Sequence, residues 1–167
     1  EGAQVVCCGR RMELGESLER VLGRERCRFV AADVTREADV QRVIETCMQS
    51  FGRLDCLFNN AGGPAPTGGI ETVAVEGFDA AMATLVRSVM LGMKHAAPIM
   101  VRQGSGSIIN NGSVAAVRAG LSSSMVYGAA KAAVVHLSTC AAMQLGESRV
   151  RVNCISPGGI ATGIFGK

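Results

Sequence analysis

Short apolar runs of the kind that form strands alternate along the chain with longer stretches whose apolar residues recur at helical spacing. The runs that predict strands are 3–8, 27–32, 54–59, 106–111 and 149–155. The stretches that predict helices are 12–22, 37–51, 76–101 and 125–146. Alternation of this kind is the pattern of repeated βα units. We therefore expect an α/β fold in three layers, with a mainly parallel sheet covered by helices on both faces.

The length and charge of the chain limit the kinds of protein it can be. Its 167 residues with 48% hydrophobic content suffice for one compact domain, and we expect a single domain over residues 1–167. A net charge of +3 without a basic stripe argues against nucleic acid as a partner. No apolar run approaches the roughly 20 residues that cross a bilayer, so we expect no membrane association.

The cysteines indicate a reducing environment. All seven are scattered, mostly within apolar runs, and none forms a CxxC or paired-histidine spacing. The first residues, 1–4, carry neither a basic segment nor an apolar segment of the secretory kind. We therefore expect buried thiols, no bound metal and a cytoplasmic location.

The segment 62–69 is rich in glycine and proline and directly follows a predicted strand. Pro64 and Pro66 remove backbone N–H donors, which makes the segment unsuitable as a phosphate-binding loop. Open α/β sheets bind ligands beyond the carboxyl ends of their strands. We expect this segment to form a flexible rim of such a site.

Tyr127 and Lys131 begin the last predicted helix and are spaced to lie on the same helix face, one turn apart. A phenol, with a reference pKa of about 10, is a poor base at neutral pH. A nearby ammonium favours the phenolate, so the pair can act as a general acid or base. The alternative for an isolated pair of this spacing is a tyrosine at an interface and a solvated lysine.

Three further features follow predicted strands. Ser113 comes after 106–111, the motif Asn59-Asn60-Ala61-Gly62 ends 54–59, and Pro157-Gly158 stops 149–155. Each one alone is also compatible with an ordinary turn. Because the carboxyl ends of parallel strands meet at one edge of a sheet, we expect these features and Tyr127 to face the same cleft.

Taken in this order and approximate spacing, these motifs closely resemble those of the short-chain dehydrogenases/reductases. The resemblance runs from the second strand of that family to just past its sixth strand. It implies a Rossmann-type three-layer sandwich and a nicotinamide-dependent oxidoreductase, which transfers a hydride between NAD(P) and a small alcohol or ketone. Tyr127 would be the proton donor or acceptor, Ser113 would orient the substrate oxygen, and Lys131 would lower the tyrosine pKa and bond the nicotinamide ribose.

The same resemblance implies a set of residues that bind the cofactor. These are Arg10, Asp33 and Val34 around the adenosine, Asn60, Ala61 and Gly62 at its ribose, and Tyr127, Lys131, Pro157, Gly158 and Ile160 around the nicotinamide. NAD-preferring relatives usually place an acidic residue at the end of the second strand. Gly9 and Arg10 stand there in this chain, and Arg10 suits a 2′-phosphate, although arginines that start helices are often simply solvated. We expect NADP, with NAD as the alternative.

The chain departs from the family pattern in three respects. The Gly-rich turn that cradles the pyrophosphate is absent, so we expect the chain to be truncated at both ends, with the first strand upstream of Glu1. Residues 1–167 alone should then bind cofactor weakly and show no measurable turnover. Leu85 stands where the family carries a catalytic Asn. One extra residue separates Ser113 from Tyr127, and we expect the loop 122–124 to absorb it.

Two of the predicted helices also suggest self-association. The stretches 76–101 and 125–146 carry more apolar residues than one buried face needs, and in the family these helices form a dimer contact. We expect a homodimer or homotetramer. The alternative to an enzyme is a catalytically inactive relative that persists as a binding or oligomer-forming module, which Leu85 and the missing turn would favour.

Overall fold

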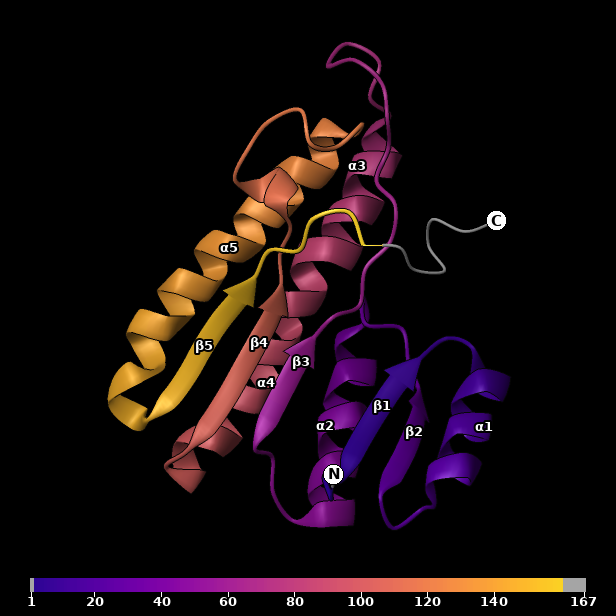
Figure 1. The fold of residues 1–167 in the computed structure, drawn as a ribbon, viewed down its shortest axis with the longest axis vertical. Helices are drawn as coiled ribbons and strands as arrows, with labels where there is room; N and C mark the ends of the chain where they lie inside the picture. Colours follow the sequence, from indigo (N-terminus) through magenta and orange to yellow (C-terminus); the bar gives the residue numbers. More distant parts are fainter. Residues whose placement is uncertain (1, 161–167) are drawn as a thin grey trace.

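The computed structural model describes residues 2–160, and its elements follow the predicted order (Figure 1). The strands are β1 Val5–Gly9, β2 Cys27–Ala31, β3 Cys56–Asn59, β4 Gly106–Asn111 and β5 Val150–Ile155. The helices are α1 Met12–Leu22, α2 Glu37–Phe51, α3 Val75–Met82, α4 Ser88–Gln103 and α5 Met125–Leu145. The α/β Rossmann-type architecture is confirmed, with every paired strand parallel.

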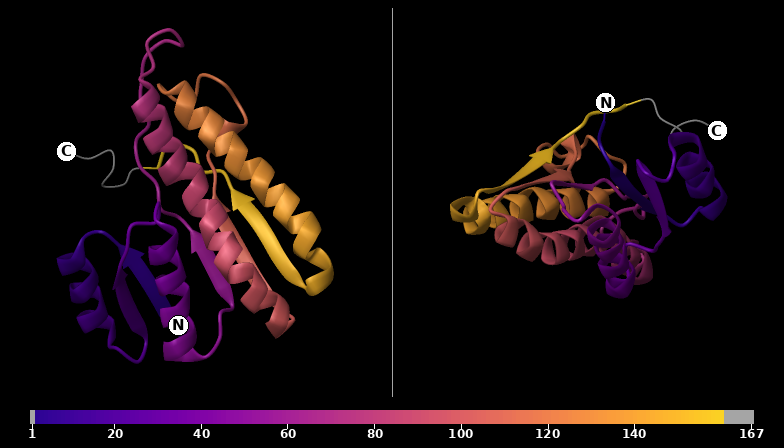
Figure 2. Two further views of the ribbon diagram at one scale, coloured as in Figure 1. Left: turned by 180° about the vertical axis from the view of Figure 1, so that it is seen from behind. Right: turned by 90° about the horizontal axis from the view of Figure 1, so that it is seen from below.

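The strands form two sheets rather than one continuous sheet. β1 pairs with β2, and β4 lies between β3 and β5. Within the described residues, the edges of β1 and β3 that face one another share no ladder. In the family expected from the sequence, a further strand lies between these two edges. The helices lie on both faces, with α2, α4 and α5 on one side and α1 on the other (Figure 2).

Three short helical turns lie between these strands and helices. The π-helical turn η1, Ala83–Arg87, joins α3 to α4, so the predicted helix 76–101 is one continuous stretch with a widened turn in its middle. The 3₁₀ turns are η2, Val114–Ala116, and η3, Gly146–Ser148. Gly52 ends α2 in the left-handed conformation that favours glycine, as the sequence predicts.

The main core lies between the three-stranded sheet and the helices α2, α4 and α5. Ile108, Val150 and Val152 of the strands pack there against Val89 and Met100 of α4. The unit formed by β1, α1 and β2 contributes no residue to this cluster. Among residues 2–160, no helix is long and apolar enough to span a membrane.

Helix α2 connects the two sheets. It packs against β1 on one side and against α4 on the other. At its start, the Glu37 carboxylate accepts hydrogen bonds from Lys94 Nζ at 2.6 Å and pairs with His95 Nε2 at 3.0 Å. Within residues 2–160, helix packing therefore holds the smaller sheet against the larger one, and the two sheets share no ladder.

Candidate functional site

Lys131 is the most buried charged group at the carboxyl ends of the three-stranded sheet. It is 4% exposed, and its Nζ donates to the carbonyl of Asn111, the last residue of β4, at 2.6 Å. Burial lowers the pKa of Lys131, and the nearby Cys154 thiol acts in the opposite direction. Lys131 is therefore held at the carboxyl end of β4.

Tyr127 lies one turn before Lys131 on α5, as the spacing predicts. Lys131 Nζ is 5.7 Å from the centroid of the tyrosine ring. The ring is half-buried and packs on a small apolar cluster that includes Ala81, Leu85 and Ala130. An ammonium and a phenol thus share one helix face at the rim of the sheet, as the spacing of the two residues predicts.

Leu85 occupies the middle of the π-helical turn η1 and is fully buried in this apolar cluster. A Cβ atom placed on Gly62 would stand 3.7 Å from Leu85 Cδ2, so the leucine also borders the Asn60-Ala61-Gly62 segment. The side chain at this position therefore gives the site an apolar wall, where the family carries an amide.

Ser113 lies directly beyond β4 and caps the turn η2. Its Oγ accepts the backbone N–H of Ala115 at 3.2 Å, and the residue is buried. The turn η2 lies against the start of α5, because a Cβ on Gly128 would be only 3.2 Å from the carbonyl of Ala115. A glycine next to Tyr127 thus allows the serine-bearing turn to approach α5 closely.

The segment expected to border the nicotinamide is joined to the same turn. The carbonyl of Pro157, just beyond β5, accepts the backbone N–H of Val114 at 3.0 Å. Gly158 and Ile160 are exposed beyond it. The predicted nicotinamide segment and the predicted substrate-orienting serine are therefore neighbours.

Asn111 connects Lys131 with the segment expected to contact the adenosine ribose. Asn111 Nδ2 donates to Oδ1 of Asn60 at 2.9 Å, while its backbone carbonyl holds Lys131. Its own Oδ1 is buried and has no hydrogen-bond partner among residues 2–160. Asn60, Ala61 and Gly62 are exposed beyond β3. A buried acceptor without a donor beside an exposed turn is the environment of a ligand or water site.

A second amide network lies deeper in the fold and was not predicted from the sequence. Asn59 Nδ2 donates to Asn110 Oδ1 at 2.8 Å, and Asn110 Nδ2 donates to Ser138 Oγ at 2.9 Å. Ser138 donates in turn to the carbonyl of Val134 at 2.7 Å. The available signal was a pair of asparagines at the end of each of two buried strands.

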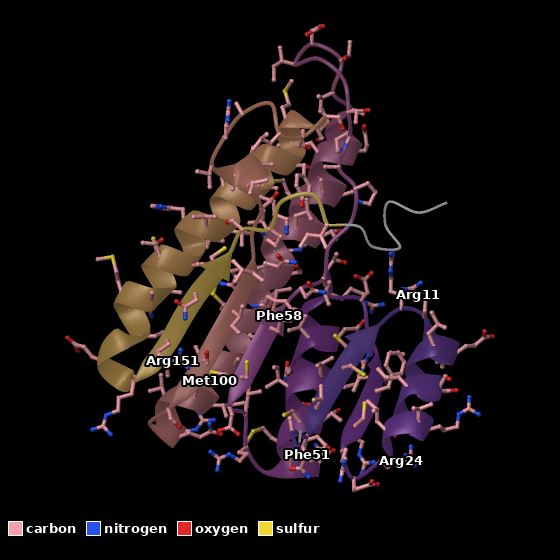
Figure 3. The ribbon with its side chains drawn as sticks, in the orientation of Figure 1. Arg11, Arg24, Phe51, Phe58, Met100 and Arg151 are labelled. Atoms are coloured by element: carbon pink, nitrogen blue, oxygen red, sulfur yellow. The ribbon has the colours of Figure 1, made fainter. Side chains whose placement is uncertain are left out.

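The expected adenosine site lies at the ends of β1 and β2. Asp33 Oδ1 accepts both the backbone N–H of Thr35 at 2.9 Å and its hydroxyl at 2.7 Å. These two bonds, followed by the charge of Arg10, hold the pKa of Asp33 below its usual value. Arg10 is exposed between β1 and α1, next to Arg11, which Figure 3 labels. Val34 is half-buried beside Asp33.

The glycine- and proline-rich segment is anchored more firmly than a flexible rim. The carbonyl of Pro66 accepts a hydrogen bond from Ser124 Oγ at 2.5 Å. Its ring packs on α3, since a Cβ on Gly77 would lie 3.2 Å from Pro66 Cβ. The loop 122–124, expected only to absorb an extra residue, therefore contacts the segment 62–69 at the start of α5.

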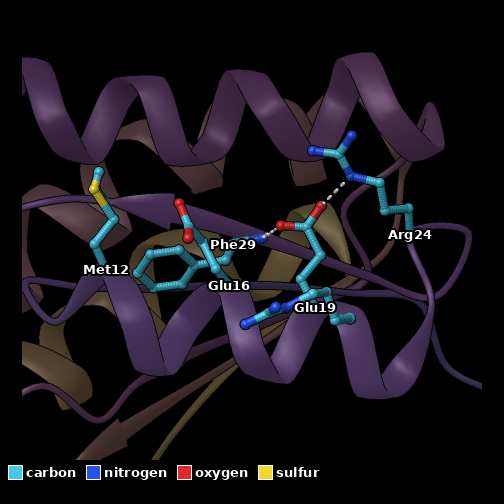
Figure 4. A pocket seen from close by; sticks show the side chains of 7 residues that line it. Met12, Glu16, Glu19, Arg24 and Phe29 are labelled. Atoms are coloured by element: carbon cyan, nitrogen blue, oxygen red, sulfur yellow. Dashed lines mark hydrogen bonds and ion pairs between the residues drawn. The ribbon is translucent and has the colours of Figure 1, made fainter.

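A shallow depression beside α1 lies apart from these residues (Figure 4). There the buried Glu19 carboxylate accepts hydrogen bonds from Arg24 Nε at 2.6 Å and from the backbone N–H of Phe29 at 3.3 Å. The bond from Arg24 holds the pKa of Glu19 below its usual value. Phe29 belongs to β2, so this ion pair covers the outer edge of the smaller sheet. Across residues 2–160 no cluster of His, Cys, Asp and Glu suits a metal ion.

Proteins of similar sequence belong to the family that the fold and the Tyr127 and Lys131 pair indicate. The profile of the family described as enoyl-(acyl carrier protein) reductase matches residues 1–167. Momilactone A synthase of Oryza sativa subsp. japonica is 39% identical over 163 residues, 96% of this chain and 59% of that protein. (+)-Borneol dehydrogenase 2 of Salvia officinalis is 39% identical over 166 residues, 98% and 58% of the two chains. Short-chain dehydrogenase reductase 5 of Arabidopsis thaliana is 37% identical over 164 residues, 98% and 63%.

Solved structures show the same fold. NAD⁺-bound xylitol dehydrogenase superposes with a TM-score of 0.89 at 29% identity, covering 97% of this chain and 63% of that one. ElxO with NADP bound superposes with a TM-score of 0.87 at 29% identity, covering 96% and 65%. These likenesses define a Rossmann-type α/β protein. The chain belongs to the short-chain dehydrogenase/reductase family, and it spans about 60% of the length of the relatives it matches.

Proposed function

We propose that the complete protein is an NAD(P)-dependent oxidoreductase that interconverts a small-molecule alcohol and the corresponding carbonyl compound. The observation that carries this proposal is the position of Lys131 Nζ, 5.7 Å from the ring centre of Tyr127 and bonded to the end of β4. The relatives include (+)-borneol dehydrogenase 2 and xylitol dehydrogenase, and their names support the same reaction class.

The described residues fit a nicotinamide dinucleotide. At the strand ends, Asn60, Ala61 and Gly62 are exposed next to the buried, unpartnered Oδ1 of Asn111. Arg10 offers an exposed cation at the end of β1 for a phosphate. The bound cofactor would supply or accept the hydride. NADP and NAD⁺ are each bound in one of the superposed structures, and Arg10 favours NADP for this chain.

The chain's own residues would move the proton. In the reducing direction, the Ser113 hydroxyl would hold the carbonyl oxygen of the substrate, and Tyr127 would donate a proton to that oxygen. Lys131 would stabilise the resulting phenolate through its charge. In the oxidising direction, Tyr127 would take the alcohol proton. Because Leu85 offers no polar group, we expect slower or differently routed proton supply than in relatives that carry Asn there.

We further propose a homodimer or homotetramer in the cytoplasm. A groove between the outer faces of α4 and α5 is lined mainly by apolar side chains, and Met90 and Val101 on its rim are 39% exposed. An apolar face of this kind supports association through these two helices. Cys8, Cys56 and Cys140 are exposed, so the expectation of buried thiols is wrong for these three residues. All seven thiols are free, which supports a reducing compartment.

The test measures turnover of a panel of ketones by the complete protein with NADPH or NADH. The absorbance of the reduced cofactor reports the rate. Tyr127→Phe should abolish most turnover and leave the unfolding midpoint nearly unchanged, because only a hydroxyl is lost. Lys131→Ala should lower both activity and cofactor affinity. Near-normal kcat in the Tyr127→Phe variant would show that the acid or base is another group.

Leu85 favours one alternative, a family member that binds cofactor without turning over. Such a protein would give saturable cofactor binding by calorimetry and no reaction with any alcohol or ketone of the panel. Replacement of Ser113 by Ala separates the two functions further. It should reduce kcat in an enzyme and change nothing in a binding module.

A further inference from the structure

Ser124 occupies the boundary between the loop 122–124 and the catalytic helix α5. It is 4% exposed and caps the helix: its Oγ accepts the backbone N–H of Tyr127 at 3.1 Å. The first N–H groups of a helix have no carbonyl partner in the preceding turn, so this hydroxyl is what holds the Tyr127 backbone in place.

The same hydroxyl contacts a segment distant in sequence. Ser124 Oγ donates to the carbonyl of Pro66 at 2.5 Å, across 58 residues of chain. Pro66 also lies close to Gly77 of α3, where an added Cβ would be 3.2 Å from Pro66 Cβ. A serine hydroxyl has one proton to donate and lone pairs to accept, and here both capacities are used. The loop after β3 is thus tied to the turn that carries Tyr127.

Lys131, the second member of the Tyr127 and Lys131 pair, is held by a separate contact. Lys131 is anchored on the Asn111 carbonyl at 2.6 Å, so it is held by β4. Tyr127 is half-buried at the first turn of the helix, where helices fray most readily. The separation between the two groups therefore depends on Asn111 at one end and on Ser124 at the other.

We infer that Ser124 is a positioning residue for Tyr127, which couples the loop 62–69 to the catalytic helix. The inference rests on the proposed oxidoreductase function, because Tyr127 is the acid or base only in that reaction. Loss of the hydroxyl frees the Tyr127 N–H and the Pro66 carbonyl together. The ring then leaves the position in which it meets a substrate oxygen held by Ser113.

The kinetic experiment compares Ser124→Ala, Ser124→Thr and Ser123→Ala in the complete protein. Ser124→Ala should lower kcat by about 10- to 100-fold, the scale of a misplaced reacting group, while KM for the cofactor changes less than about twofold. Threonine keeps a capping hydroxyl and should restore most of kcat. Ser123 is an exposed neighbour and serves as the matched control. If Ser124→Ala changes the KM for the cofactor but not kcat, or if threonine does not restore kcat, Ser124 is not a positioning residue.

A second measurement does not depend on turnover. Tyr127 is the single tyrosine of residues 1–167, which contain no tryptophan, so tyrosine fluorescence reports on this ring. The Tyr127→Phe variant provides the blank and removes any signal from other parts of the protein. Ser124→Ala should raise the acrylamide quenching constant of the tyrosine severalfold and lower its anisotropy, whereas Ser123→Ala should not.

The two measurements separate the two hypotheses. If no substrate is turned over but quenching rises in Ser124→Ala, the proposed function is wrong and the anchoring of Tyr127 by Ser124 is right. If turnover is normal and quenching is unchanged in Ser124→Ala, the anchoring is wrong and the proposed function stands. If Ser124→Ala lowers the unfolding midpoint but leaves the quenching of Tyr127 in the folded protein unchanged, Ser124 is only a structural helix cap.

Ser124→Asp distinguishes the two bonds of the hydroxyl. A carboxylate can accept the Tyr127 N–H but has no proton to donate to the Pro66 carbonyl. We expect wild-type quenching of Tyr127 together with a KM for substrate raised about threefold to tenfold, a change of roughly 0.7–1.4 kcal/mol. An unchanged KM for substrate in Ser124→Asp would show that the loop 62–69 is not coupled to the site. Increased quenching of Tyr127 would contradict the capping role of Ser124.

Discussion

Asn59 and Asn110 are joined by a side-chain hydrogen bond of 2.8 Å between neighbouring strands inside the core. Asn110 is fully buried and continues the network to Ser138 of α5. Space for Asn59 exists because Gly92 of α4 has no side chain, and a Cβ there would overlap the Asn59 amide. The network thus fixes the distance between β3, β4 and both covering helices directly below the candidate site.

Replacement of Asn110 by Ala should lower the free energy of unfolding by about 2–3 kcal/mol, because the Asn59 amide loses its acceptor at 2.8 Å and the Ser138 oxygen loses its donor at 2.9 Å. Urea denaturation followed by circular dichroism measures the change. Asn153→Ala is the matched control, since Asn153 is exposed on β5. Equal effects of the two substitutions would show that the buried amides contribute nothing.

Lys131 should make stability depend on pH in the alkaline range. Burial lowers its pKa in the folded state, so the unfolded chain binds more protons between the folded value and the unfolded value of about 10.4. The buried charge therefore costs stability at lower pH, and the cost disappears as pH rises through this window. We expect wild type to gain stability relative to Lys131→Met between pH 7 and pH 10, by urea denaturation without cofactor. A constant difference would contradict this.

Arg10 should discriminate between the two dinucleotides. A charge-assisted pair with a 2′-phosphate contributes about 1.5–3 kcal/mol, so Arg10→Ala should raise KM for NADP at least about tenfold. KM for NAD should change less than about twofold, because NAD lacks that phosphate. Arg26→Ala, an exposed arginine before the opposite end of β2, should leave both unchanged. Wild-type preference for NAD in steady-state assays would overturn the expectation of NADP.

Association should depend on the groove between α4 and α5. Ala141→Arg places a charge among its apolar lining and should shift the complete protein toward the monomer, measured as molar mass by light scattering over a range of concentrations. Ala38→Arg, on the exposed face of α2, should have no such effect. A wild-type protein that is monomeric at every concentration would contradict the proposal.

The sequence predicts the elements well because their patterns are local. Strand 106–111 coincides with β4, and the helix ends at Gly52 and near Leu145 follow from short-range signals. The break between β1 and β3 is not local, since it depends on which strands are neighbours in the sheet. It is the resemblance to a family, and not periodicity, that points to a strand between them.

The candidate site shows the same contrast between features set by local sequence and features set by distant contacts. The spacing of Tyr127 and Lys131 is enough to place them on one helix face, and the contact between them follows. The hydrogen bonds of Asn110 and Ser124 depend on the register of β3 with β4 and on the path of the segment 62–69. Neither is encoded in the spacing along the chain, so these partners could not be predicted.

The separation of the strands into two sheets has a consequence for how residues 1–167 open when they are studied without the rest of the protein. The unit of β1, α1 and β2 lies outside both apolar clusters, and its helix leaves Leu14 and Val21 largely exposed. Within residues 2–160, fewer buried contacts and the unpaired edge of β1 mean that little surface must be exposed to detach this unit. Its backbone amides should therefore exchange with deuterium through a sub-global opening, at lower free energy than those of β4 and β5. The adenosine end of the site would then belong to a less cooperative part of the fold than the end that carries Lys131.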